Sequence, residues 1–205
     1  GGGIVGMFGI DLDVSDRKRA EERLRVSEQR FRLLSEAAAV LLSTDNTDDM
    51  LRGLFAKIAP PLGLDLYLNY VVDGTDETLR LASSVGVPDE VKRSMGRLAL
   101  GQAVCGMVAQ NLRPTHSRNV QQSDDPQAAG IKAIGLRAYA CYPLVSGDRL
   151  FGTFGFGSRS RDEFAPDELA FLQTVCHYVT AACERVCLVR QLREVDRRKD
   201  EFLAT

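Results

Sequence analysis

The chain has 205 residues, 44% of them hydrophobic, which is enough to bury the core of one full domain with extensions. Its 26 basic and 28 acidic side chains give a formal net charge of -2, so no basic surface for nucleic acid or an anionic membrane is expected. No apolar run approaches the ~20 residues that span a bilayer. We therefore expect a cytoplasmic fragment without membrane contact, whose parent protein could still have an anchor upstream.

The cysteines of the chain are odd in number, and no two form a Cys-x-x-Cys pair with the spacing of zinc ligands. The sequence therefore predicts neither a disulfide framework nor a metal site. Free, mostly buried thiols in a reducing compartment are expected instead. The five cysteines are Cys105, Cys141, Cys176, Cys183 and Cys187.

The chain begins with a short strand pattern at residues 4–12, followed at 13–16 by side-chain oxygens that can cap a helix. We predict that helix from Arg17 to about Ser43. At ~1.5 Å per residue it extends ~40 Å, more than one compact domain covers comfortably, so another helix should share its apolar seam. The seam has a/d spacing and consists of Ala20, Leu24, Phe31, Leu34, Ala38 and Leu41.

A second helix is predicted from Met50 to about Leu62, where two prolines and a glycine at 60–63 end it. Two strands follow at 64–72 and 79–85, joined by an Asp-Gly turn. The first strand alternates, with Leu64, Leu66, Leu68 and Tyr70 on one face and Asp65, Tyr67, Asn69 and Val71 on the other.

The middle of the chain is predicted to hold short elements in long connections. Leu98 and Leu100 begin an extended piece, and Gln102 to Gln110 is expected to be helical. A short strand over 113–120 leads into a polar loop. Further short elements are a helix at 127–134 and a hairpin of strands 138–145 and 150–158 around Ser146-Gly147-Asp148.

The last predicted helix begins at Pro166 and runs unbroken towards Phe202. Its apolar stripe first uses Leu169, Leu172, Cys176, Val179, Cys183 and Val186. It then changes register to a spacing that suits a two-stranded coiled coil, at Leu188, Leu192, Val195, Lys199 and Phe202.

Three sequence segments, taken in chain order, resemble segments of the GAF domain, and the resemblance covers roughly residues 31–188. They are Gly101-Gln102-Ala103-Val104-Cys105-Gly106-Met107-Val108-Ala109, similar to the family's glycine-flanked helix; Tyr142-Pro143-Leu144-Val145 followed by Gly152-Thr153-Phe154, similar to its hairpin; and Phe164 to Leu172, similar to the start of its last helix. Ala165 departs from the pattern, because the family commonly has a hydroxyl residue as the cap there, which costs ~1 kcal/mol locally.

The resemblance implies an α+β fold with a central antiparallel sheet, a helical bundle on one face, a small-molecule cavity on the other, and first and last helices that pair between protomers. GAF domains bind cyclic nucleotides, tetrapyrroles, metals or nothing known, so the fold leaves the ligand and cofactor open. The pair Cys176-His177 looks like a bilin attachment site, but it falls on the last helix, and no covalent bilin is expected.

The two ends of the chain resemble parts of sensor histidine kinases. The strand with Asp-Val-Ser and the charged connector after it is similar to the end of a PAS domain. Residues 197–205, Arg-Arg-Lys-Asp-Glu-Phe-Leu-Ala-Thr, are similar to the segment that leads into the dimerisation and phosphoacceptor helix. The expected division is a PAS remnant at 1–15, a connector helix at 16–30, a GAF domain at 31–187 and the truncated start of a coiled-coil helix at 188–205.

The expected function is therefore a sensory, signal-transmitting GAF module of a two-component system. The fragment itself is expected to have no enzymatic activity, and its parent would be a protein histidine kinase that meets a response regulator through its kinase region. A homodimer is expected, in which paired helices shift between two packings. The candidate dimer residues are Leu24, Phe31, Leu34, Leu188, Leu192, Val195 and Phe202, with Arg190, Arg193 and Lys199 near the seam to keep the packing from becoming too stable.

Candidate ligand-pocket residues come from four places. Cys105 lies near a helix start that could lower its pKa, and Cys141 lies in a strand expected to border the cavity; simple packing is the alternative for both. His116 with Asp124 could reach the cavity from a loop, unless that loop is merely solvated. The remaining candidates are strand residues that ordinary core packing would also explain: Tyr67, Asn69, Tyr139 and Phe154.

Two other functions stay open. One is a thiol-dependent reductase of the methionine-sulfoxide type found within the GAF family, with Cys105 or Cys141 as nucleophile; it needs a resolving thiol nearby. The other is a ligand-free spacer that only dimerises.

The glycines at 152, 155 and 157 do not form a phosphate-binding loop, because they lie within an alternating strand and no Gly-Lys-Ser/Thr follows.

Overall fold

The computed structural model describes residues 14–44, 46–74 and 78–203. Within them the chain forms one six-stranded antiparallel sheet in the order β3-β2-β1-β6-β5-β4, with helices on both faces, so the predicted α+β class is confirmed. The strands are β1 (Leu66–Asp73), β2 (Thr78–Val85), β3 (Arg97–Ala99), β4 (Thr115–Ser117), β5 (Ala138–Ser146) and β6 (Arg149–Ser158). The expected PAS strand lies outside the described residues.

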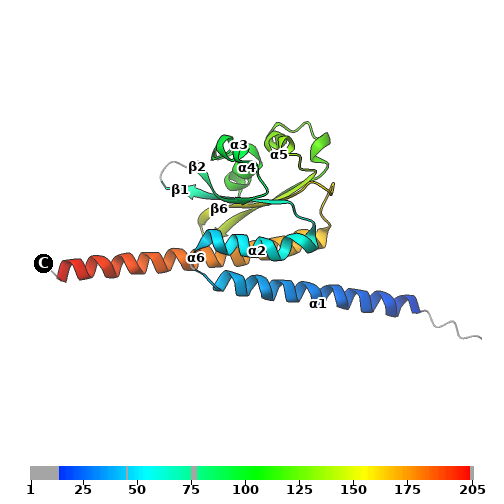
Figure 1. Cartoon of the computed structure of the whole chain (residues 1–205), viewed down its shortest axis with the longest axis horizontal. Coiled ribbons are helices and arrows are strands. Elements are labelled where there is room, and N and C mark those ends of the chain that lie inside the picture. Colours follow the sequence, from blue (N-terminus) through cyan, green and yellow to red (C-terminus); the bar gives the residue numbers. More distant parts are fainter. Residues whose placement is uncertain (1–13, 45, 75–77, 204–205) are drawn as a thin grey trace, which may run out of the picture.

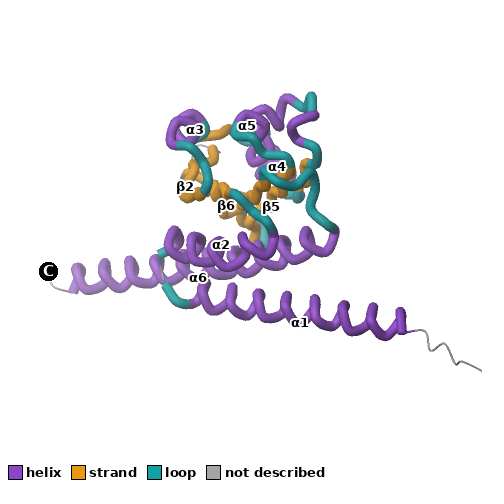
Figure 2. Tube along the Cα trace, turned by 45° about the vertical axis from the view of Figure 1, so that its right-hand side comes forward, coloured by secondary structure: helices purple, strands orange, loops and turns teal. Residues whose placement is uncertain are grey.

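The helices divide between the two faces of the sheet (Figure 1). Helices α1, α2 and α6 lie on one face, and the shorter helices α3, α4 and α5 lie on the other (Figure 2). Their bounds are α1 (Val14–Leu42), α2 (Thr47–Leu62), α3 (Asp89–Ser94), α4 (Ala103–Asn111), α5 (Ala129–Ala133) and α6 (Pro166–Leu203). None of the helices among the described residues combines the length and apolar character that crossing a bilayer requires.

Each face of the sheet has its own hydrophobic core, because alternate residues of every strand point to opposite sides. In β1, Leu66, Leu68 and Tyr70 enter the core under α4, as the alternation predicts. Tyr67 enters the core under α2 and α6. The β5–β6 hairpin, predicted from its turn residues, is confirmed, with Ser146 opposite Arg149.

Capping residues set the bounds of α2. The side chain of Asn46 accepts a hydrogen bond from the Asp48 backbone N–H, so the helix begins at Thr47, three residues before the predicted start. Gly63 ends it in the left-handed conformation, and Pro60 and Pro61 lie inside the last turn.

Two predicted elements between α4 and β5 are shorter than expected. The strand predicted over 113–120 covers only Thr115–Ser117, because Val120 already begins a 3-10 turn. The helix predicted from 127 to 134 divides into a 3-10 turn at Pro126–Ala128 and α5. Asp125 caps that turn by accepting a hydrogen bond from the Gln127 N–H.

The first and last helices extend beyond the globular body in opposite directions (Figure 1). The last part of α1 packs against the core through Ala37 and Leu41, both buried. Helix α6 is a single helix of 38 residues, as predicted, and its body half buries Leu172, Val179 and Val186. The side chains of Leu24 and Phe202 lie outside the described part of the chain.

Candidate functional site

Three of the predicted pocket residues meet in the core under α4. Cys105 comes from α4, and Tyr139 and Cys141 come from β5. The Cys105 Sγ lies 3.2 Å from the Tyr139 Oη and 3.9 Å from the Cys141 Sγ. Gly155 makes this approach possible, because a Cβ there would lie 1.9 Å from the Tyr139 hydroxyl.

Burial controls the acid-base behaviour of this thiol pair. Burial raises the pKa of Cys141 well above its ordinary value, and the hydrogen bond from Cys141 lowers the pKa of Cys105. The exposed fractions of Cys105 and Cys141 are 3% and 0%, so limited access, more than acidity, restricts their chemistry.

Three other predicted pocket residues lie on the opposite face of the sheet. Tyr67 and Phe154 are fully buried against α2, with their ring centroids 5.4 Å apart. The Tyr67 hydroxyl lies 2.6 Å from the Ser83 Oγ. Asn69 lies on this same face of β1, so none of the three joins the thiol cluster. The alternation of residues in this strand correctly predicted that Tyr67 and Asn69 share one face of the sheet. It could not indicate which of the two faces that would be.

His116 and Asp124 also lie apart from the thiols. The His116 ring lies 5.5 Å from the Tyr142 ring, and partial burial lowers the pKa of the histidine. Asp124 is exposed in the connection between the two 3-10 turns. Among the described residues, no three His, Cys, Asp or Glu side chains gather as they would around a metal ion.

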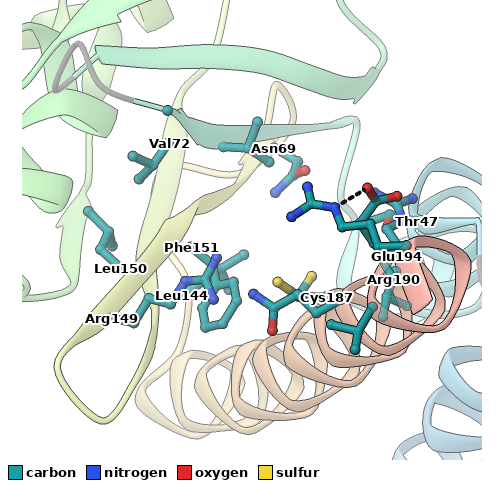
Figure 3. Close-up of a pocket in the computed structure, with 17 residues that line it drawn as sticks. Thr47, Asn69, Val72, Leu144, Arg149, Leu150, Phe151, Cys187, Arg190 and Glu194 are labelled. Carbon is teal, nitrogen blue, oxygen red and sulfur yellow. Dashed lines mark hydrogen bonds and ion pairs between the residues drawn. The ribbon is translucent and has the colours of Figure 1, made fainter. Parts of the chain in front are cut away.

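A groove of about 940 Å³ lies between the sheet and the outer half of α6 (Figure 3). On one side lie β1 and the β5–β6 hairpin, with Asn69, Arg149 and Phe151. On the other side lies α6, with Cys187 and Arg190. Its residues come from four separate stretches of sequence, the fourth represented by Thr47 at the start of α2. We define this hollow as the α6 groove.

Two features give the α6 groove a polar character on an apolar floor. Asn69 is 1% exposed, and its Nδ2 donates to the Thr153 carbonyl over 3.3 Å, while its Oδ1 has no hydrogen-bond partner among the described residues. The Arg149 guanidinium lies over the Phe151 ring, 4.7 Å from its centroid. The sequence prediction placed Arg190 near a dimer seam, whereas the structure places it in the lining of this groove.

The outer half of α6 also carries uncovered apolar residues, of which Val195 lies at the edge of the α6 groove. Leu188, Leu192 and Val195 are 53%, 66% and 63% exposed. On the same part of the helix, Glu194 forms exposed ion pairs with Arg197 and Arg198. Together these two pairs lower the pKa of Glu194 to about 2. On α1, Phe31 is 74% exposed, and Leu34 is half-buried against the core.

Comparison with known proteins gives the family of this chain. The family model described as "GAF domain" matches residues 44–184, more than half of the chain. The chain therefore belongs to the GAF domain family. No curated protein matches it.

Several solved structures share the fold. The GAF domain of a phosphoenolpyruvate-protein phosphotransferase from Acinetobacter is 17% identical, with a TM-score of 0.66, 80% of this chain covered and 98% of that one. The corresponding domain from Coxiella burnetii is 16% identical, with a TM-score of 0.68 and coverages of 79% and 96%. A free methionine-R-sulfoxide reductase from Neisseria meningitidis, in complex with its substrate, is 18% identical, with a TM-score of 0.67 and coverages of 78% and 91%.

Proposed function

We propose that this chain is a dimeric signal-transmitting GAF module of a two-component sensor histidine kinase. Helix α1 would bring the signal in, and α6 would pass it to a phosphoacceptor helix. The observation that carries the proposal is α6 itself, which is one helix from Pro166 in the body to Leu203 outside it.

The outer half of α6 supports a helix-helix interface. Leu188, Leu192 and Val195 repeat with i, i+4, i+7 spacing and remain exposed in the single chain. Exposed large apolar residues in such a row are costly unless another surface covers them. A second copy of the same helix, in parallel register, would bury this stripe with a/d packing.

The inner half of α6 connects that interface to the domain core. Leu172, Val175 and Val179 are fully buried against the sheet and α2, so this half is fixed in the body. A change in the body that tilts or rotates α6 would then displace the outer stripe, because one continuous helix joins the two. The kinase context is proposed from the resemblance of residues 197–205 to the segment before a phosphoacceptor histidine.

Sedimentation velocity at micromolar concentration tests the dimer. We expect a species of twice the chain mass of 22.5 kDa. A strictly monomeric protein with the full helix content by circular dichroism would contradict the proposal.

The kinase context is tested with a chimera. Residue 205 is joined in heptad register to the dimerisation and catalytic region of a histidine kinase, and autophosphorylation is measured. An insertion of two residues after Leu188 rotates the outgoing face by ~200° and should change the activity at least severalfold, whereas an insertion of seven restores the register. Equal activity in all three chimeras would contradict a relay through α6.

The thiol-dependent reductase remains a second candidate because one observation favours it. The Cys105 Sγ lies 3.9 Å from the Cys141 Sγ, so a resolving thiol stands beside the nucleophile. Against it, both thiols are buried, and the space around them is filled by fully buried side chains such as Leu68, Tyr70 and Tyr139. That filled core also suits a ligand-free spacer, unless a ligand binds elsewhere in the molecule.

A further inference from the structure

We propose that the α6 groove is a ligand site for an amphipathic anion: a carboxylate, sulfonate or phosphate group on an apolar body that carries one hydrogen-bond donor. This proposal adds a ligand class and a binding place to the proposed signalling role. Ligand binding itself does not depend on that role; only the effect of the ligand on α6 does. The site lies on the α6 side of the sheet, away from the thiol cluster under α4.

We infer the anionic group of the ligand from two arginines that lie on opposite sides of the groove. Arg149 lies on the hairpin side and Arg190 on the α6 side (Figure 3). Neither has a carboxylate partner among the described residues, whereas Arg198 is already paired with Glu194. Guanidinium groups bind carboxylate, sulfonate and phosphate oxygens through charge-assisted hydrogen bonds.

We infer the apolar body of the ligand and its hydrogen-bond donor from the other residues that line the groove. Leu144, Leu150 and Phe151 give the hairpin side an apolar surface. Figure 3 shows the Asn69 side chain pointing from β1 into the groove. Because a buried acceptor without a partner has lost its hydrogen bonds to water, a ligand N–H or O–H that reaches the Asn69 Oδ1 would recover this loss. A hollow of about 940 Å³ is large enough for a drug-sized molecule.

The position of the groove links occupancy to the outgoing helix. Cys187, Arg190 and Glu194 follow one another at helical spacing on the groove side of α6. The stripe of Leu188, Leu192 and Val195 is centred roughly a third of a turn away on the same helix, and Val195 lies where the stripe meets the groove. A ligand held between the hairpin and α6 would therefore fix the orientation of the stripe.

The probe pair for the test is 8-anilinonaphthalene-1-sulfonate and N-phenyl-1-naphthylamine, which share an aromatic body and one N–H donor and differ only by the sulfonate. Binding is followed by fluorescence titration of the intact protein. We expect the sulfonate to bind more tightly than the neutral probe by about tenfold or more, the range of a charge-assisted hydrogen bond. Equal affinities would overturn the proposal.

Three variants locate the binding. Arg149→Gln with Arg190→Gln should remove the tenfold preference for the sulfonate. Arg80→Gln with Arg193→Gln, which removes the same charge outside the groove lining, should keep it. Asn69→Leu should weaken both probes. Unchanged sulfonate binding in the Arg149/Arg190 variant would overturn the proposal, and circular dichroism checks that each variant folds.

Alkylation of Cys187 provides an independent reading of the place. The thiol is half-buried and lines the groove, so saturating sulfonate probe should slow its reaction with iodoacetamide severalfold. Unchanged labelling of Cys187 would mean that the probe binds elsewhere, on the exposed stripe for example, and would overturn the site. Because sedimentation is measured separately, groove binding by a monomer would sink the dimer proposal and leave this one standing.

Discussion

Cys187 and Leu188 are neighbours in the sequence but serve different sides of α6: Cys187 lines the groove against the sheet, and Leu188 is 53% exposed on the outgoing stripe. One turn of one helix therefore carries both a candidate ligand contact and a candidate dimer contact. This adjacency would allow a signal to pass without any rearrangement of the sheet, because a rotation of the helix moves both sides together.

The stripe should be necessary for dimerisation. Leu188→Glu with Leu192→Glu places four like charges in the parallel interface of two chains, so we expect a monomer at concentrations where the unchanged chain is a dimer. Leu112→Glu is the matched control, since Leu112 is also an exposed leucine, at 51%, but lies outside the terminal helices. Light scattering after size-exclusion chromatography checks this. A dimer that survives the double change would place the interface elsewhere.

The buried thiols should be inert in the folded protein. We expect Cys105, Cys141 and Cys176 to react with iodoacetamide at pH 8 roughly 100-fold more slowly than the half-buried Cys187, because reaction requires the core to open. Burial also raises the pKa of Cys176, which keeps it protonated. Peptide mapping by mass spectrometry gives the rates, with urea-unfolded protein as the control. Fast native labelling of Cys105 or Cys141 would revive the reductase alternative.

Gly155→Ala should destabilise the domain. The added Cβ would lie 1.9 Å from the Tyr139 hydroxyl, so β6 and β5 would have to separate locally. We expect a loss of about 2–3 kcal/mol in the free energy of unfolding. Urea denaturation measures it.

The same clash predicts a non-additive double variant. Tyr139→Phe removes the hydroxyl and with it the contact to Cys105, at a cost of about 1 kcal/mol on its own. In the Gly155→Ala background the same change should cost less, because the closest clashing atom is gone, while the ring Cζ, 2.5 Å from the added Cβ, still has to shift. Strict additivity would show that the strain arises elsewhere.

Protonation of His116 should lower the free energy of unfolding as the pH falls. Partial burial lowers its pKa below the ordinary value of 6.5, so the unfolded chain binds the proton more readily than the folded one. Stability is therefore retained above about pH 6.5 and lost as the pH falls through and below that value. His116→Gln should show a smaller loss between pH 7 and pH 5 in urea denaturation. An identical pH profile in the variant would exclude His116 as a source of the effect.

Local patterns predicted the elements of this fold well, because each depended on neighbouring residues. The alternation of β1 and the turn at Gly147 needed no distant information. The short elements after α4 were less predictable, since the segment predicted as one helix at 127–134 divides into a 3-10 turn, which Asp125 caps at its start, and α5.

The candidate site was harder to predict than the fold. Alternation grouped Tyr67 with Asn69, but only the packing of α2 on the sheet decides that they face away from Cys105. The α6 groove joins residues separated by more than a hundred positions, Asn69 and Arg190, so no local pattern could indicate it. A weak signal was present in the charges at 190, 194 and 198, which repeat along one side of the outer half of α6.

Disulfide cross-linking along α6 tests the central claim most directly. In a background with Cys183→Ser and Cys187→Ser, Leu192→Cys should form a covalent dimer rapidly under mild oxidation, because the stripe would bring the two copies of position 192 together. Arg193→Cys, one residue further round the helix, should cross-link far more slowly. Equal rates at the two positions, or no cross-linking at Leu192→Cys, would contradict a parallel pairing of α6 with its copy.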